Sequence, residues 1–215
     1  GTASDPKTTF VQIKGSSTTI TPITLNDTGI TLCASASSST ETCSSNHVNQ
    51  DAQVGRDFTH NDDSDGHAGF SFTKLDSQGQ ALLDQTASYT TTPWSCVKDN
   101  VTGLTWEIKT DDDGLHDLDW TYSWYNPDST KNGRNPGVES NGVCNTTSDT
   151  ASCDTLKYVQ TVNAENLCGA NDWRLPSANE MISLFHYNYN QYTPAATDLD
   201  PNYFPYRLQS RSEEH

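Results

Sequence analysis

The chain has 215 residues, 32% of them hydrophobic, and a formal net charge of -16 at neutral pH. This charge argues against nucleic acids and anionic membranes as partners, because both would be repelled, and no run of about 20 apolar residues predicts a transmembrane helix. Nine Tyr, five Trp and six Phe argue against a disordered chain. We therefore expect a folded, loop-rich protein with an aromatic core.

Residues 8–25, "TTFVQIKGSSTTITPITL", alternate β-branched and polar residues and predict one or two strands. Because these strands are N-terminal, they are expected to pair at a sheet edge or with another chain. Residues 33–43, "CASASSSTETC", predict a low-complexity loop. Residues 70–76, "FSFTKLD", predict a further strand, residues 94–110 predict a β-hairpin around an "NVTG" turn, and residues 120–126, "WTYSWYN", predict an aromatic strand or turn.

Two helices are expected after this aromatic region. The first begins after Asp154 as N-cap, carries an apolar stripe of Leu156, Val159 and Val162, and ends near Gly169. The second begins at the capping box formed by Ser177 and Glu180. Between the helices, "DWRLP" is expected to be a short extended link with Trp173 buried and Arg174 in a structural salt bridge.

The sequence contains six cysteines, and no two have the C-x-x-C spacing of zinc ribbons or thioredoxin-like sites. An even number of cysteines in a Ser/Thr-rich chain is typical of disulfides formed in an oxidising compartment, so we expect a secreted or surface-exposed protein. Six cysteines permit many pairings. Proximity along the chain favours Cys33–Cys43 and Cys144–Cys153, which leaves Cys96–Cys168.

Several segments resemble the C-terminal domain family of Legionella collagen-like proteins (Lcl_C). The resemblance rests on "WSCVKDNVTGLTWEIKT", "VNAENLCGANDWRLPSANEMISLFHY" and "DPNYFP", and on the motifs D-N-x-T-G-L-x-W and D-W-R-L-P-x-x-x-E; it extends from about Gln50 to Pro205. It implies a bacterial secreted or surface protein with an α+β, C-type-lectin-like or formylglycine-enzyme-like fold. The named member is an adhesin for sulfated glycans, but 12 Lys and Arg against 28 Asp and Glu do not favour sulfate binding here.

Together these features predict an α+β, C-type-lectin-like fold with short antiparallel strands, two helices, long loops and disulfide staples. Residues 1–45 are expected to form an N-terminal β arm with a small disulfide loop, and residues 46–215 an Lcl_C-like domain. After "YFP" the family usually continues with a "YWSS" strand and further strands, whereas "YRLQSRSEEH" follows here. Two explanations stay open: a truncated sequence, or a gap in the sheet that a strand from a neighbouring copy fills.

Two acidic loops are candidate calcium sites, since Ca²⁺ takes six to eight oxygen ligands from carboxylates and carbonyls. The candidate ligands are Asp111, Asp113, Asp117 and Asp119 in one loop, and Asn61, Asp63 and Asp65 in the other. Neither run is an EF-hand, because the closing glutamate is missing. The alternatives are a solvated loop and an Asx-rich surface turn.

The remaining candidate site is aromatic. Trp120, Tyr122 and Trp124 alternate, so one face of this strand could stack on a glycan, although most tryptophans are expected in the core. His67 and His116 lie beside acidic residues and are expected to form structural hydrogen bonds, because no metal-binding histidine spacing is present. No G-x-S-x-G, P-loop or Cys/His nucleophile pattern is present, so no catalytic residues are predicted.

These observations lead to two functional hypotheses. The leading one is a non-enzymatic, extracellular structural or adhesive protein that forms homo-oligomers or filaments by donation of the N-terminal strand. The alternative is a monomeric, calcium-assisted glycan-binding adhesin module.

Overall fold

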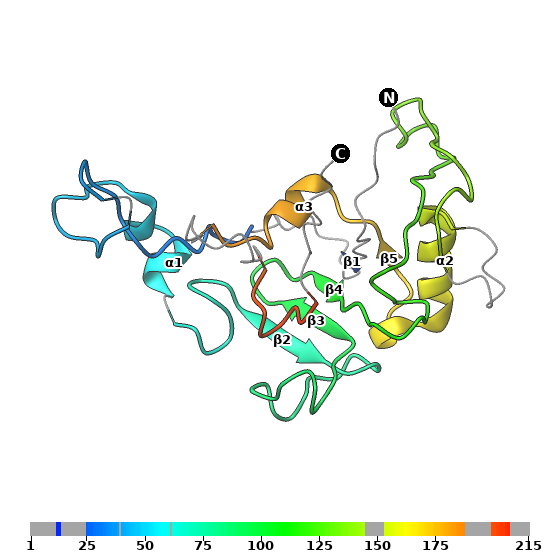
Figure 1. The fold of residues 1–215 in the computed structure, drawn as a ribbon, viewed down its shortest axis with the longest axis horizontal. Coiled ribbons are helices and arrows are strands. Elements are labelled where there is room, and N and C mark those ends of the chain that lie inside the picture. Colours follow the sequence, from blue (N-terminus) through cyan, green and yellow to red (C-terminus); the bar gives the residue numbers. More distant parts are fainter. Residues whose placement is uncertain are drawn as a thin grey trace.

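The computed structural model describes residues 12–13, 25–38, 40–60, 62–144, 153–187 and 199–206. Its strands are β1 (Gln12–Ile13), β2 (Phe72–Leu75), β3 (Cys96–Asp99), β4 (Thr105–Glu107) and β5 (Trp173–Arg174). They form one antiparallel sheet in the order β2-β3-β4-β1-β5. The N-terminal strand β1 therefore lies inside the sheet, between β4 and β5 (Figure 1).

The hairpin predicted around "NVTG" is confirmed as β3 and β4, with Val97 opposite Trp106. Its turn is held by the buried Asp99, whose Oδ1 accepts the backbone N–H groups of Val101 at 2.9 Å and Thr102 at 3.2 Å. Gly103 has φ +76°, a left-handed conformation that glycine adopts without strain. The strand predicted within residues 70–76 is β2, which pairs with β3.

The helices are short: η1 (Asp51–Gln53), α1 (Arg56–Thr59), α2 (Thr155–Glu165), η2 (Leu167–Gly169) and α3 (Ala178–Ile182). Asp154 is the N-cap of α2, as predicted, and accepts the backbone N–H of Lys157. The expected end near Gly169 is wrong, because Asn166 takes a left-handed conformation (φ 57°) that terminates α2 one turn earlier.

The capping box predicted for α3 is confirmed. The Ser177 hydroxyl group accepts the N–H of Glu180, and the Glu180 carboxylate accepts the N–H of Ser177. Glu180 also receives two hydrogen bonds from Arg174, of 3.0 and 2.8 Å, so the structural salt bridge predicted for Arg174 is confirmed. This pair fixes α3 against β5.

Two apolar clusters form the core. One contains Phe70, Phe72, Trp94, Val97, Leu104, Trp106, Ile108, Leu184, Leu199, Tyr203 and Phe204. The other contains Leu75, Cys96, Tyr122, Cys144, Cys153, Tyr158, Val162, Cys168 and Trp173. The second cluster lies beside α2 and includes two of the three disulfides.

The disulfides are Cys33–Cys43, Cys96–Cys168 and Cys144–Cys153, the pairing that proximity along the chain favours. Cys96–Cys168 joins β3 to η2 and so connects the sheet to the segment after α2. The predicted strand at residues 120–126 forms isolated bridges, of Thr121 with Val143 and of Tyr125 with Gly137, and joins no sheet.

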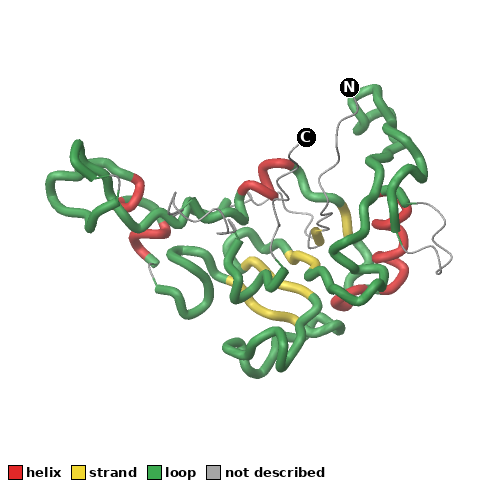
Figure 2. The backbone as a smooth tube through the Cα atoms, viewed as in Figure 1, coloured by secondary structure: helices red, strands yellow, loops and turns green. Residues whose placement is uncertain are grey.

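Figure 2 shows that loops connect most of these elements, so the mixed α+β content and the long loops that the sequence predicts are confirmed. One part projects from the sheet. We call residues 30–60, with the Cys33–Cys43 disulfide, η1 and α1, the disulfide lobe (Figure 1). Within the described residues, no helix has the length and apolar character needed to cross a membrane.

Candidate functional site

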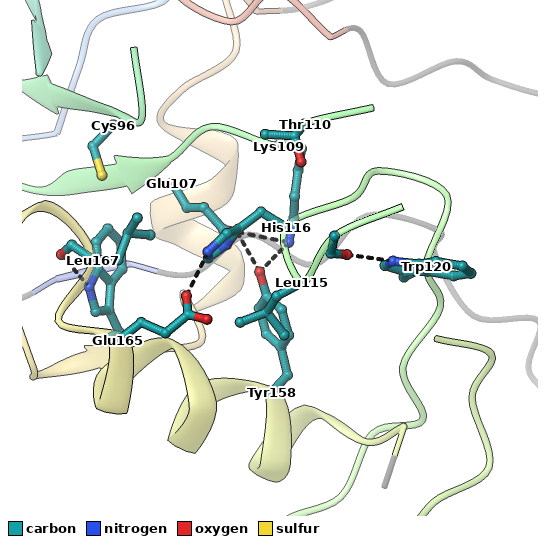
Figure 3. A network of polar contacts seen from close by, with 12 residues as sticks. Cys96, Glu107, Lys109, Thr110, Leu115, His116, Trp120, Tyr158, Glu165 and Leu167 are labelled. Atoms are coloured by element: carbon teal, nitrogen blue, oxygen red, sulfur yellow. Dashed lines mark hydrogen bonds and ion pairs between the residues drawn. The ribbon is translucent and has the colours of Figure 1, made fainter. Parts of the chain in front are cut away.

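The loop that follows β4, residues 110–120, is anchored by charged side chains that lie inside the protein. The end of β4 and the two residues after it are buried on both faces: Trp106 and Ile108 pack into the first apolar cluster, whereas Glu107 and Lys109 point toward α2 (Figure 3). Glu107 is 1% exposed and Lys109 is 6% exposed. Ionised side chains are rarely so deeply buried unless they are paired.

Glu107 is the centre of this buried network. Its Oε1 accepts hydrogen bonds from Lys109 Nζ at 3.1 Å, from His116 Nδ1 at 2.7 Å and from the Tyr158 hydroxyl group. On its other side, His116 Nε2 lies 3.0 Å from Glu165 Oε2 (Figure 3). The network thus connects β4, the acidic loop and α2, which are distant in the sequence.

The local electrostatics favour the charged forms of the acid and the histidine. Burial acts to raise the pKa of Glu107, but Lys109 and then His116 outweigh it, so this pKa lies below its usual value. Burial acts to lower the pKa of His116, yet the hydrogen bond with Glu107 raises it above its usual value. Burial lowers the pKa of Lys109. Because Glu107, Lys109 and Tyr158 are buried and bonded to one another, while His116 is partly exposed, the arrangement is suited to fastening the loop.

In the first predicted calcium loop, one aspartate forms hydrogen bonds with the backbone of the loop itself. Asp117 is buried, and its carboxylate accepts the backbone N–H groups of Asp112, Asp113 and Asp119, each at 2.7 Å. The other predicted ligands in this loop, Asp111, Asp113 and Asp119, are exposed. Asp117 therefore shapes the turn as an acceptor of backbone hydrogen bonds.

The second predicted calcium loop is held in a similar way. Asp63 Oδ1 accepts the N–H of Ala68 at 3.0 Å and lies 3.2 Å from His67 Nδ1, which agrees with a structural role for His67. Asp65 accepts the hydroxyl group of Ser71. Asn61 lies outside the described residues. Across the described part of the chain, no three His, Cys, Asp or Glu residues converge as metal ligands, so Ca²⁺ at either loop stays a prediction.

The three aromatic residues predicted to contact a glycan differ in exposure. Trp124 is 42% exposed. Trp120 is partly buried, and its indole N–H donates to the Gly114 carbonyl at 2.6 Å. Tyr122 is only 6% exposed and packs against Tyr158, with ring centroids 4.6 Å apart. The exposed aromatic surface of this segment is therefore provided mainly by Trp124.

A further candidate site is the position that β1 occupies in the sheet. Gln12 lies opposite Trp106 of β4 and Arg174 of β5, and Ile13 lies opposite Thr105 and Trp173. Among the strands that the structure describes, β5 pairs with β1 alone. The N-terminal strand thus fills a slot between β4 and β5 and attaches β5 to the sheet.

Comparison with known proteins gives one match. The Lcl C-terminal domain family matches residues 95–213, which is more than half of the 215-residue chain. The chain belongs to this family. No curated protein and no solved structure matches. Family membership, together with the three disulfides, is consistent with a bacterial surface or secreted protein.

The Lcl C-terminal domain match begins at residue 95, later than the resemblance from Gln50 that the sequence motifs indicate. It contains the hairpin β3–β4, the acidic loop, α2 and the complete Glu107 network. Two residues of the acidic loop have clear structural uses in this range. His116 joins Glu107 to Glu165, and Asp117 caps the turn.

Sequence reasoning missed most of the network in this Lcl C-terminal domain. It predicted that His116 forms structural hydrogen bonds, and this is confirmed, but its partner Glu165 lies 49 residues away. On α2, Tyr158 and Val162 are buried, whereas Leu156 and Val159 of the predicted stripe are only partly buried. The sequence pattern carried no signal of this burial, because alternation places Thr105, Glu107 and Lys109 on one polar face, as in a strand with one side in solvent.

Proposed function

We propose that this protein is a non-enzymatic, extracellular structural or adhesive protein whose copies associate by exchanging the N-terminal strand β1. Family membership and the disulfides support the extracellular location. The observation that carries the assembly is the position of β1 between β4 and β5. The C-type-lectin-like architecture implied by the resemblance stays a prediction.

The slot holds β1 through the pairing of extended backbones. Without β1, the backbone N–H and C=O groups of β4 and β5 that face the slot would be unpaired, which is costly inside a protein. Backbone pairing does not distinguish the strand of the same chain from the identical strand of another copy. The same slot can therefore accept β1 in trans without a new interface having to evolve.

The strand order also explains how such an exchange could build an assembly. A copy that donates β1 to a neighbour leaves its own slot open for the β1 of a third copy. If the geometry closes, the product is a ring or a dimer; if it does not close, the product is a filament. In the proposed filament, Gln12 and Ile13 would form the joint between neighbouring copies, in the slot that β1 occupies here.

The experiment divides one cysteine pair between two chains. Ile13 lies opposite Thr105, so Ile13→Cys and Thr105→Cys provide adjacent thiols wherever β1 sits in the slot. The two single variants are purified with their native disulfides formed, mixed at high concentration and mildly oxidised. Strand exchange predicts a covalent heterodimer on a non-reducing gel.

Two controls make the result interpretable. The double variant Ile13→Cys/Thr105→Cys in one chain reports pairing within a chain. A mixture of Ile13→Cys with Lys98→Cys, an exposed position one strand further away on β3, reports random collisions. The proposal fails if the double variant forms its internal disulfide while the mixture of single variants gives no more dimer than the Lys98 control.

A second candidate function is calcium-assisted glycan binding by a single copy, and the exposed Trp124 favours it. Aromatic side chains that remain exposed often stack on apolar faces of ligands. A glycan array with wild-type protein, Trp124→Ala and added chelator tests this candidate. Binding that requires both Trp124 and Ca²⁺ would support it, whereas absence of binding with and without Ca²⁺ would remove it.

A further inference from the structure

The connection between the disulfide lobe and the rest of the protein passes through Thr28. Its backbone carbonyl accepts the N–H of Tyr187 at 2.6 Å, which ties this segment to the chain after α3. Its side-chain hydroxyl group contacts the carboxylates of Asp51 in η1 and Asp57 in α1, both in the lobe. Thr28 is therefore one of the residues at which lobe and body meet. Beside it, Asp27 accepts the N–H groups of Arg56 and Asp57, and the Gly69 carbonyl accepts from the Arg56 side chain.

The Thr28 hydroxyl group contacts two carboxyl groups but has only one proton to donate. Thr28 Oγ1 lies within hydrogen-bond distance of Asp51 Oδ2, and 3.2 Å from Asp57 Oδ2, while the N–H of Ile30 donates to it at 3.3 Å. A hydroxyl group has one proton to donate and two lone pairs. It can donate to only one ionised carboxylate, so the second carboxyl group joins the hydrogen-bond chain when it is protonated and donates to the remaining lone pair.

Asp57 is the carboxyl group suited to carry that proton. It is 1% exposed, whereas Asp51 is exposed to solvent. Asp57 Oδ1 accepts no hydrogen bond of normal geometry from the described residues, and the nearby backbone N–H of Phe58 favours the ionised form less than burial disfavours it. In agreement with this geometry, burial raises the pKa of Asp57 to about 6, and the carboxylate of Asp27 acts in the same direction.

The other charged groups around Asp57 do not supply a compensating positive charge. Asp27 and Asp51 act on it with like charge. Arg56, on the same helix, directs its guanidinium group to the Gly69 carbonyl at 2.8 Å. In the loop packed against α1, His67 is paired with Asp63 at 3.2 Å.

We propose that one proton, shared between the Asp57 carboxyl group and the Thr28 hydroxyl group, holds the disulfide lobe against the body, and that loss of this proton loosens the lobe. In the closed state Asp57 donates to Thr28, which donates to Asp51, so the three segments are joined in one chain of hydrogen bonds. This inference does not depend on strand exchange, because Asp57 and Thr28 lie outside the β1 slot.

The sign of the pH dependence follows from linkage. In an opened lobe the pKa of Asp57 returns toward 3.8, below its value of about 6 in the closed lobe. The closed form then binds more protons between these two values, so opening becomes easier as the pH rises from about 4 to 6 and levels off above that. A shift of about two pKa units corresponds to roughly a 100-fold change in the opening equilibrium.

Amide hydrogen exchange measures this opening. The protection factor of the Arg56 N–H group reports the contact between lobe and body, because it donates to Asp27, whereas that of His60, which donates to the Arg56 carbonyl, reports α1 within the lobe. The amide of Val97 in β3 reports the body. Between pH 4 and 7 the lobe protection factors of the wild-type protein are expected to fall by about 100-fold, while protection of Val97 changes less.

Three variants and one titration decide the outcome. Asp57→Asn, whose amide group can donate to Thr28 at every pH, is expected to keep high protection without a pH-dependent fall. Thr28→Val, which lacks the hydroxyl group, is expected to show low lobe protection at every pH. Glu139→Gln removes an exposed carboxylate elsewhere and should behave as wild type.

The ¹³Cγ chemical shift of Asp57 in the wild-type protein gives its pKa without any substitution, so the test does not depend on folding of the variants. Titration near 6 supports the proposal. Titration near 3.8, lobe protection that is constant between pH 4 and 7, or the same fall in Asp57→Asn as in wild type would each overturn it.

Discussion

Replacing Lys109 by methionine tests how strongly the buried charge network stabilises the protein. Lys109 is 6% exposed and its partner Glu107 is 1% exposed, so the substitution removes a positive charge and leaves a buried carboxylate behind. Removing one partner of a buried ion pair typically costs about 3–5 kcal/mol. Because Glu107 keeps its contacts with His116 and Tyr158, we expect the lower end, about 3 kcal/mol.

Thermal and urea unfolding measure this loss. For a chain of this size, 1 kcal/mol corresponds to about 2–4 °C, so the melting temperature should fall by roughly 10 °C. The matched control is Lys131→Met, which removes an exposed lysine 3.7 Å from Asp128. That exposed pair is expected to contribute less than about 1 kcal/mol. The double variant Glu107→Gln/Lys109→Met should recover part of the loss, because it removes the unpaired charge as well.

The loss of stability in Lys109→Met should also depend on pH. Burial acts to raise the pKa of Glu107, and Lys109 is the strongest influence against it. In Lys109→Met the folded protein should therefore take up a proton at Glu107 more readily than the unfolded chain does. The destabilisation then shrinks as the pH falls from 7 toward 5. A Lys109→Met variant as stable as Lys131→Met at pH 7 would refute the reasoning.

Three further predictions concern local structure. Hydrogen bonds from Arg174 hold the pKa of Glu180 at about 2, below its usual 4.5. This pair therefore stabilises the fold above pH 4.5 and loses its effect as the pH falls toward 2. Acid unfolding curves of wild type and Glu180→Gln should converge near that pH. Asp154→Ala removes the N-cap of α2 and should lower the free energy of unfolding by about 1 kcal/mol in urea, and an unchanged value would contradict the cap. Gly137 has φ +79°, and Gly137→Ala places a Cβ against Trp124. The substitution should lower the free energy of unfolding by more than about 1 kcal/mol and alter tryptophan fluorescence. Unchanged stability would contradict this packing.

Features set by neighbouring residues could be predicted well. The hairpin at "NVTG", the N-cap Asp154 and the capping box of Ser177 with Glu180 depend on contacts within a few residues, so their patterns are visible in the sequence. The end of α2 was predicted one turn too late, because the left-handed conformation of Asn166 competes with the glycine signal at Gly169.

The surroundings of the candidate site residues could not be predicted from the sequence, because the contacts of a charged side chain depend on the segments that pack against it. Asp117 was predicted as a metal ligand, which stays a prediction, and the sequence did not reveal that its carboxylate accepts three backbone N–H groups of its own loop. Tyr122 alternates with Trp120 and Trp124, yet Tyr158 covers it. The helix α2 itself could be predicted, but its packing against this loop could not be read from the local pattern.

By itself, the amino-acid sequence determined the mixed α+β content, the local caps and turns, the family motifs and a disulfide pairing based on proximity. Only the tertiary structure decided that β1 enters the sheet between β4 and β5, that Glu107, Lys109, His116 and Tyr158 form one buried network, and that Thr28 joins the lobe to the body. The physical reason is the distance along the sequence over which each kind of contact forms. Caps, turns and side-chain alternation depend on residues a few positions apart, whereas strand order and the burial of charge depend on segments that meet only when the chain folds.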